Sequence, residues 1–339
     1  MAPLSGFRAD LVGVEVDAFG LHRALPAGMI AKIWVMTNCG MTDRDYVERL
    51  KGHLAAYRLN ELHVRDTGSW GSPPRAYGHI LPPGVKEKNI VAAHRERFWK
   101  VQAGQHWTLH QYFHHLSSSQ ALAFNLFFAG YPQLPKTFAA FRRVLQLDLA
   151  TPYAVNFEVV LDDAENNNDG ENTNIDVLLT DADGRRTIIE IKLTEGSFGR
   201  AKNDQRHLKK LRKVYYPRLT GRVTDECLEP KTFFKDYQLF RNVAQIRRGS
   251  SDRVVFLIPR KRARLWQHAT EWSLSPRLGV LRQQVAVIAI EDVIEALRED
   301  SSSPEMPAGL ATQVSLKYSL AEPALVSGDG SVLRRRGHR

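Results

Sequence analysis

Two carboxylates and a lysine occur close together in the middle of the chain. In a strand over Ile188-Ile-Glu-Ile-Lys-Leu193, side chains alternate between the two faces, so Glu190 and Lys192 share one face. Asp176 precedes Glu190 by fourteen residues, and Asp181-Ala-Asp-Gly184 between them is typical of a hairpin turn. A hairpin of this length can place Asp176 beside Glu190.

Such a group suits metal-assisted chemistry on phosphate. Two adjacent carboxylates are unfavourable without a cation, because each negative charge raises the pKa of the other group. Mg²⁺ prefers one or two carboxylates, water and phosphate oxygens, and it lowers the pKa of a bound water. Lys192 could orient or deprotonate that water, or offset charge in the transition state. The alternative is a solvated strand face on which Glu190 and Lys192 form an ion pair.

The surrounding periodicity indicates an α/β fold. Alternating patterns predict strands over 153–161, 174–180 and 186–193, and apolar runs predict buried strands over 253–259 and 285–290. Helices are expected over 43–58, with Thr42 as N-cap, and over 117–128, 200–215, 234–247 and 291–298. The order helix, three strands, helix, strand predicts a mixed central sheet flanked by helices.

The ends of the chain have a different character. We expect residues 1–43 to form an N-terminal extension, with a strand-like run over 31–36, and Met41 could be the true initiator. A nuclease-like domain with a helical N-terminal part is expected over 44–299. Residues 300–339 are rich in Ser, Pro and Gly and end in arginines, which predicts a flexible basic tail.

Composition narrows the class of protein. The net charge of +10 favours a polyanionic partner, and nucleic acid is the commonest one. The two cysteines are far apart, there is no apolar signal core, and no run of eighteen apolar residues suggests a membrane span, so we expect a cytoplasmic protein. His106, His110, His114 and His115 have no HExxH pattern or cysteine partner, which disfavours zinc.

Several short motifs together resemble a known group of enzymes. Asn174-Ile-Asp176 followed by Ile189-Glu-Ile-Lys192 resembles the motif of the PD-(D/E)xK nuclease superfamily, although the proline before the aspartate is missing. The likeness, to a bacterial restriction-endonuclease-like branch, covers about residues 44 to 295. It includes the segments 77–82, 114–128, 156–158, 192–199 and 237–242.

The resemblance implies a restriction-endonuclease-like αβββαβ core and a set of roles. Asp176, Glu190 and Glu158 would be metal ligands together with the Ile191 carbonyl, and Lys192 would be the catalytic lysine. The cofactor implied is Mg²⁺, for which Mn²⁺ can substitute. Glu158 could instead be a peripheral structural carboxylate.

Accessory roles stay open between two readings. Gln120 could bond a metal water or the substrate, or cap its helix. Glu195 could lie behind the ligands or bind a second ion, or be a solvated loop residue. Gln238 could position Lys192 or a phosphate, or be simply buried. A basic run could track a phosphate backbone or be a solvated face. It comprises Arg200, Lys202, Arg206, Lys209, Lys210, Arg212 and Lys213.

These features together predict a Mg²⁺-dependent endonuclease that hydrolyses DNA, of restriction, defence or repair type. A homodimer is plausible because restriction-type enzymes often pair to cut both strands. Two alternatives remain: a catalytically inactive nuclease fold that binds nucleic acid or acts in assembly, and RNA as the substrate.

Overall fold

The computed structural model describes residues 41–105, 107–161 and 174–320, which belong to a compact unit that begins at Met41. The predicted strand over 31–36, the segment that would precede an initiator at Met41, and the end of the basic tail lie outside the described residues. Among the described residues, no helix is long and apolar enough to cross a membrane.

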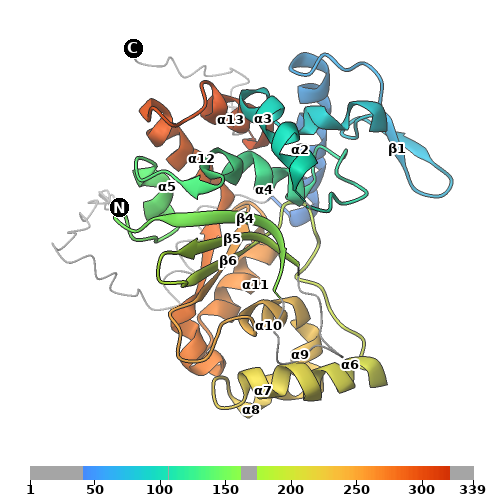
Figure 1. Cartoon of the computed structure of the whole chain (residues 1–339). Helices are drawn as coiled ribbons and strands as arrows, with labels where there is room; N and C mark the ends of the chain where they lie inside the picture. Colours follow the sequence, from blue (N-terminus) through green and yellow to red (C-terminus); the bar gives the residue numbers. More distant parts are fainter. Residues whose placement is uncertain (1–40, 106, 162–173, 321–339) are drawn as a thin grey trace, which may run out of the picture. The chain divides into compact units, whose positions relative to one another are not determined.

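A six-stranded mixed sheet organises this unit, in the order β3-β4-β5-β6-β7-β8 (Figure 1). The pairs β3–β4, β4–β5 and β5–β6 are antiparallel, whereas the pairs β6–β7 and β7–β8 are parallel. The strands are β3 (Gln133–Leu134), β4 (Tyr153–Val160), β5 (Asn174–Asp181), β6 (Arg186–Ile191), β7 (Arg253–Ile258) and β8 (Val285–Ala289). The mixed sheet and its flanking helices are as expected.

Helices cover both faces of the sheet, and each face has its own apolar core (Figure 1). One face packs against α2 (Asp43–Asn60), α3 (Ala92–Gly104), α4 (Ser119–Phe127), α5 (Ala139–Val144), α12 (Ile290–Glu299) and α13 (Leu310–Tyr318). The other packs against η4 (Leu211–Tyr215), α7 (Tyr216–Leu219), α8 (Asp225–Leu228), α9 (Pro230–Lys235), α10 (Tyr237–Val243) and α11 (Ala263–Ser273). The alternation of side chains along β6 supplies both cores: Ile189 and Ile191 pack in the first core, and Ile188 packs in the second.

Helix α2 begins where the sequence predicts, directly after Thr42. The Thr42 side chain accepts from the Asp45 N–H at 3.2 Å, and the Asp45 carboxylate accepts from the Thr42 N–H at 3.0 Å, which is a reciprocal capping box. Tyr46, Leu50 and Leu54 are buried on one face of α2. The capping pattern and the apolar stripe together fix the start and orientation of this helix.

Two predicted helices differ in their bounds. The helix expected over 200–215 begins at α6 (Gln205–Lys210), because Asp204 accepts from the His207 N–H and caps it there. It continues through a π-helical turn, η4, into α7. The helix expected over 234–247 is broken at Asp236 into α9 and α10, where the backbone leaves helical geometry.

The prediction of a flexible tail from residue 300 is wrong for the described residues 300–320. The buried Asp300 carboxylate accepts from the N–H groups of Ala140 and Phe141 at the start of α5, at 3.0 and 2.8 Å. Beyond it, α13 buries Leu310 and Val314 completely in the first core. The Ser, Pro and Gly residues of this segment make connecting turns before a packed helix.

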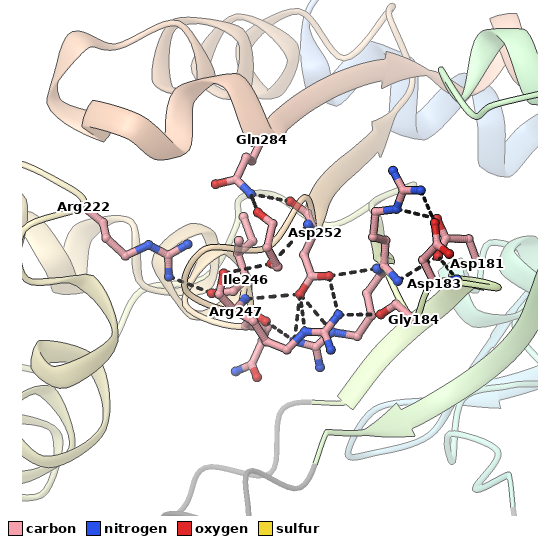
Figure 2. A network of polar contacts seen from close by, with 12 residues as sticks. Asp181, Asp183, Gly184, Arg222, Ile246, Arg247, Asp252 and Gln284 are labelled. Atoms are coloured by element: carbon pink, nitrogen blue, oxygen red, sulfur yellow. Dashed lines mark hydrogen bonds and ion pairs between the residues drawn. The ribbon is translucent and has the colours of Figure 1, made fainter.

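A buried ionic network joins the start of β6 to Asp252, the residue before β7 (Figure 2). The Asp252 carboxylate, fully buried, accepts from the Arg186 N–H at 2.9 Å and from the Arg247 guanidinium at 2.8 Å. Gln284 donates to the Asp252 carbonyl at 2.7 Å. The network fixes the register of the parallel strands at the end away from Glu190.

Candidate active site

Asp176 ends the regular pairing of β5 with β6. The last paired residues are Val177 and Ile189, and beyond them the Ile191 N–H donates to the Asp176 carboxylate at 2.7 Å. The side chain thus takes the place of a strand carbonyl as the acceptor for this amide. The hairpin between the strands forms at Asp181 to Gly184 as predicted, with Gly184 at φ +74°. It brings Asp176 to the end of β6, beside the predicted Glu190.

Glu190 and Lys192 form a buried ion pair. The Lys192 Nζ lies 2.8 Å from the Glu190 carboxylate, and the two residues are only 8% and 5% exposed. The Lys192 N–H donates to the Leu257 carbonyl at 2.9 Å, which ties the residue to β7. This burial overturns the alternative of a solvated strand face.

The negative charge of Glu190 affects the pKa of both Asp176 and Lys192. Burial raises the pKa of Asp176 well above its ordinary value, and the negative charge of Glu190 raises it further against the opposing charge of Lys192. Burial alone would lower the pKa of Lys192, but the carboxylates of Glu190, Glu195 and Asp176 outweigh it and raise that pKa to about 12. The site therefore holds one ammonium beside several acidic groups, and the negative charge of Glu190 opposes ionisation of Asp176.

Glu158 occupies an irregular position opposite Asp176. Its φ is +51°, a left-handed conformation that non-glycine residues rarely adopt. Before it, Phe157 packs in the first core; after it, Val159 packs against the second, so β4 changes the face that it buries here. Strand β5 changes faces at the same point, between Ile175 and Val177. Both strands therefore break their alternation where their carboxylates lie.

The environment of Glu158 points to the same site. Burial raises its pKa, hydrogen bonds from Gln120 and Asn174 lower it, and the charge of Glu190 raises it. Asn174 donates to the Glu158 carboxylate. Among the described residues, however, no three His, Cys, Asp or Glu side chains form a group that could hold a metal ion as they stand. A ligand set of Asp176, Glu190 and Glu158 stays a prediction, as does the Ile191 carbonyl.

An open cavity of about 470 Å³ lies over these residues. Its wall includes Asp176, Glu158, Glu195 and Gln120, while Glu190 and Lys192 are buried beside them. A cavity of about 490 Å³ at the opposite ends of the strands is lined by Arg185, Arg247 and Arg248 among others. The first two of these arginines are ion-paired with aspartates, so we place the candidate site at the carboxylate cavity.

Gln120 holds a loop above the cavity. Its Oε1 accepts from the His110 N–H at 2.8 Å and its Nε2 donates to the Thr108 carbonyl at 3.0 Å. The alternative in which Gln120 caps its own helix is wrong, because the Ser118 hydroxyl fills that role by accepting from the Ala121 N–H. A contact between Gln120 and a metal water stays a prediction.

Glu195 belongs to the loop after β6, and Gln238 packs against the same loop. The Glu195 carboxylate accepts from the Leu193 and Thr194 N–H groups at 2.7 and 2.9 Å, so it shapes the loop rather than being merely solvated. The Gln238 side chain, from α10, packs against Gly199, where an added Cβ would lie 3.2 Å from its Oε1. A role for Gln238 in positioning Lys192 stays a prediction.

The predicted basic run is mostly exposed but is divided between a loop and a helix. Arg200 and Lys202 precede the Asp204 cap and are therefore not helical, whereas the others lie on α6 and η4. Lys210 is half-buried, and the remaining exposed members are Arg206, Lys209, Arg212 and Lys213. Their contact with a phosphate backbone stays a prediction.

Arg262 is a site residue that the sequence did not reveal. It is 1% exposed and donates to the Leu193 carbonyl at 3.2 Å and the Glu195 carbonyl at 2.7 Å. Its Nε also pairs with the Asp43 carboxylate at 3.2 Å. Arg262 therefore fixes the backbone that follows Lys192. The only signal in the sequence is a basic run at 260–264, which is typical of a surface.

A mixed sheet covered by helices, with two carboxylates and a lysine gathered at the end of one hairpin, is consistent with a nuclease-like fold. The family comparison agrees. The chain belongs to the family described as restriction endonuclease associating with ARP (REase-ARP), whose model matches residues 51–319. That range includes α13, which the predicted limit at residue 295 left out. No match was found among curated proteins or among solved structures.

Proposed function

We propose that this protein is a Mg²⁺-dependent nuclease of the PD-(D/E)xK kind that hydrolyses DNA phosphodiester bonds, as an endonuclease. The observation that carries the proposal is the buried Glu190–Lys192 pair at 2.8 Å beside Asp176, whose pKa Glu190 helps to raise. Two carboxylates forced together at a cavity edge are an arrangement that a divalent cation would stabilise. The order α4, β4, β5, β6, α10, β7 supports the αβββαβ core of this superfamily.

The donor atoms fit Mg²⁺, which takes hard oxygen ligands and keeps several waters. Asp176 and Glu190 would hold it with the Ile191 carbonyl, and Glu158 would complete the acidic set. When bound, the ion would supply charge to polarise the phosphate and would lower the pKa of a water. Before binding, the Asp176 carboxylate is held in place by the Ile191 N–H, so one ligand is already positioned.

Lys192 acts in this proposal as a cation. With its pKa at about 12, the ammonium remains protonated at neutral pH in the metal-free protein, which favours stabilising negative charge over removing a proton. Its backbone is fixed by the bond from its own N–H to the Leu257 carbonyl, and its side chain is held by the ion pair with Glu190 at 2.8 Å. The ammonium can therefore face a phosphate oxygen without a large loss of side-chain freedom.

DNA is the proposed substrate because the family is restriction-endonuclease-like and the chain carries a net charge of +10. The exposed cations of the loop and helix after β6 lie next along the chain to Lys192. They would contact the phosphate backbone, and such contacts weaken with added salt because counterions are released on binding.

The experiment that tests the proposal is nicking of supercoiled plasmid and cutting of a linear duplex by the purified chain. Reactions contain Mg²⁺, Mn²⁺ or EDTA, with Asp176→Ala and Lys192→Ala beside the wild type. Matched controls are Asp183→Ala and Lys51→Ala, which remove exposed charges at other places. We expect metal-dependent cleavage that both site variants lose and both controls retain.

Other outcomes are equally decisive. Cleavage that persists in both site variants would place the activity elsewhere or in a contaminant. DNA binding without cleavage under every metal condition would favour the inactive nucleic-acid-binding module instead. Cleavage of RNA in preference to single-stranded and duplex DNA would show that RNA, rather than DNA, is the substrate. Discrete fragments would indicate a sequence-specific enzyme of restriction type.

A further inference from the structure

A chain of aromatic rings runs from the β1–β2 hairpin to the candidate active site. Trp70, in β1 (Gly68–Trp70), lies 6.4 Å from Tyr77 of β2 (Arg75–Tyr77) and 6.4 Å from Tyr112 between ring centroids. Tyr112 in turn lies 5.1 Å from both His110 and His115. We call the four rings of Trp70, Tyr112, His110 and His115 the aromatic platform.

The platform is exposed at one end and enters the cavity at the other. Trp70 is 49% exposed and Tyr112 is 37% exposed, and the two rings contact each other, so they form a joined exposed aromatic surface rather than a single exposed side chain. The hairpin that carries Trp70 projects from the body of the unit (Figure 1). Tyr112, His110 and His115 line the same cavity as Asp176 and Glu158. Whatever contacts the carboxylates therefore also meets these rings.

The charge of the platform suits a base better than a phosphate. Burial, together with the neighbouring histidines, lowers the pKa of His115 to about 4, so its ring is neutral at neutral pH. Tyr112 and Trp70 carry no charge. A neutral aromatic face attracts the π-face of a nucleobase, and base–aromatic stacking tolerates any sequence.

The stacked arrangement of duplex DNA restricts which base can make this contact. Within a duplex, each base face is covered by its neighbours, so a protein ring reaches that face only where a base has left the stack. The exposed Arg75 on the same hairpin provides a cation near Trp70 for the adjoining phosphate. These requirements are met by DNA with an unpaired base beside the bond to be cut.

We propose that the aromatic platform stacks on an unpaired nucleobase of the DNA that enters the cavity, so that the site selects DNA with an extrahelical base next to the scissile phosphate. This inference rests on the proposed function, since it assigns the substrate of the same cavity. It concerns recognition and needs no cleavage to be tested.

The test is binding of three end-labelled duplexes, measured by fluorescence anisotropy in EDTA so that no cutting occurs. One duplex is fully paired, one has a single bulged adenine, and one has an abasic bulge at the same place. We expect the full-length protein to bind the bulged adenine roughly 10-fold more tightly than the abasic bulge. Trp70→Ala and Tyr112→Ala should lose that preference.

Tyr216→Ala is the matched control, because Tyr216 is also 37% exposed but lies on α7. It should keep the preference. Equal affinity of the wild type for the adenine and abasic bulges would overturn the inference while leaving the nuclease proposal intact. A preference that survives in both platform variants, or disappears in Tyr216→Ala alone, would also overturn it. If none of the three duplexes is bound in EDTA, the platform does not hold an unpaired base and this inference is overturned, whereas the nuclease proposal, in which Mg²⁺ completes the site, is tested separately by cleavage.

Discussion

The Ile191 N–H donates to the Asp176 carboxylate at 2.7 Å, and this bond connects the backbone of the strand that carries Glu190 and Lys192 to the acid on the neighbouring strand. A strand carbonyl would satisfy the same amide without introducing charge. The carboxylate instead places an acid beside Glu190, and burial together with the charge of Glu190 raises the pKa of Asp176. Local stability is therefore reduced at the position where the proposed chemistry needs an acid.

Asp176→Asn should stabilise the metal-free protein. An acid whose folded-state pKa is raised contributes stability below its ordinary pKa of about 4, and that contribution is lost as the pH rises toward the folded value. Asparagine keeps an oxygen for the Ile191 N–H and removes the charge. We expect Tm in EDTA to rise by roughly 2–4 °C at neutral pH, with the difference shrinking toward about pH 4.

Calorimetric scans of both proteins across this pH range are the measurement. Added Mn²⁺ should raise the Tm of the wild type and leave that of Asp176→Asn unchanged. A wild type that melts above the variant in EDTA at neutral pH would show that the Asp176 charge is not the destabilising group.

Arg262 should position the loop after Lys192. Arg262→Lys keeps a positive charge but loses the planar fork that reaches the Leu193 and Glu195 carbonyls. We expect cleavage to slow by roughly 10–100-fold, since small displacements near reacting groups have effects of this size. Asp43→Asn is the control, because it weakens the ion pair and leaves both carbonyl bonds in place.

The relevant comparison is between kcat and Tm. If Arg262 only stabilises the fold, the lysine variant will melt earlier and yet cleave at the wild-type rate below its Tm. A reduced kcat with little change in DNA binding is the result that a positioning role requires.

The sequence predicted those parts of the site that depend on local order. Period-two alternation placed Glu190 and Lys192 on the same side, and the hairpin turn brought Asp176 to them. It did not predict the change of buried face at Glu158, because alternation assumes a regular strand and that residue has a φ of +51°. It did not find Arg262, since a contact made about seventy residues along the chain leaves no periodic signal.

The C-terminal segment illustrates a different limit. Composition suggested flexibility from residue 300, yet Asp300 caps α5 and α13 fills the first core. Leu310 and Val314 are too few to form a strong helical pattern by themselves. Their burial depends on a groove made by elements more than two hundred residues earlier, such as α2 and α3.

Ending the chain at Glu299 should therefore prevent stable folding. The truncation removes Leu310, Val314 and Tyr318 from the first core, and burial of each such side chain is worth about 1.5–3 kcal/mol. It also removes the Tyr318 hydroxyl that accepts from the Asn125 Nδ2 at 2.8 Å. A chain ending at Leu320 keeps these contacts and is the control. Circular dichroism with thermal melting compares the two, and equal Tm values would refute the packing role of α13.

Asp252 should be the main determinant of acid stability. Burial raises the pKa of its carboxyl, but hydrogen bonds from Arg247 and Arg186 outweigh burial and hold that pKa well below its ordinary value (Figure 2). An acid whose folded-state pKa is lowered contributes stability above its ordinary pKa of about 4, and the contribution is lost as the pH falls toward the folded value.

Asp252→Asn leaves two guanidinium groups without their partner and should cost about 3–5 kcal/mol. Asp183→Asn, at an exposed ion pair near the same network, should cost less than about 1 kcal/mol. Urea unfolding across acidic and neutral pH measures both variants, and the loss for Asp252→Asn should be largest at neutral pH because the wild type has the full contribution there. Equal losses for the two aspartates would mean that the buried network does not hold β6 and β7 together.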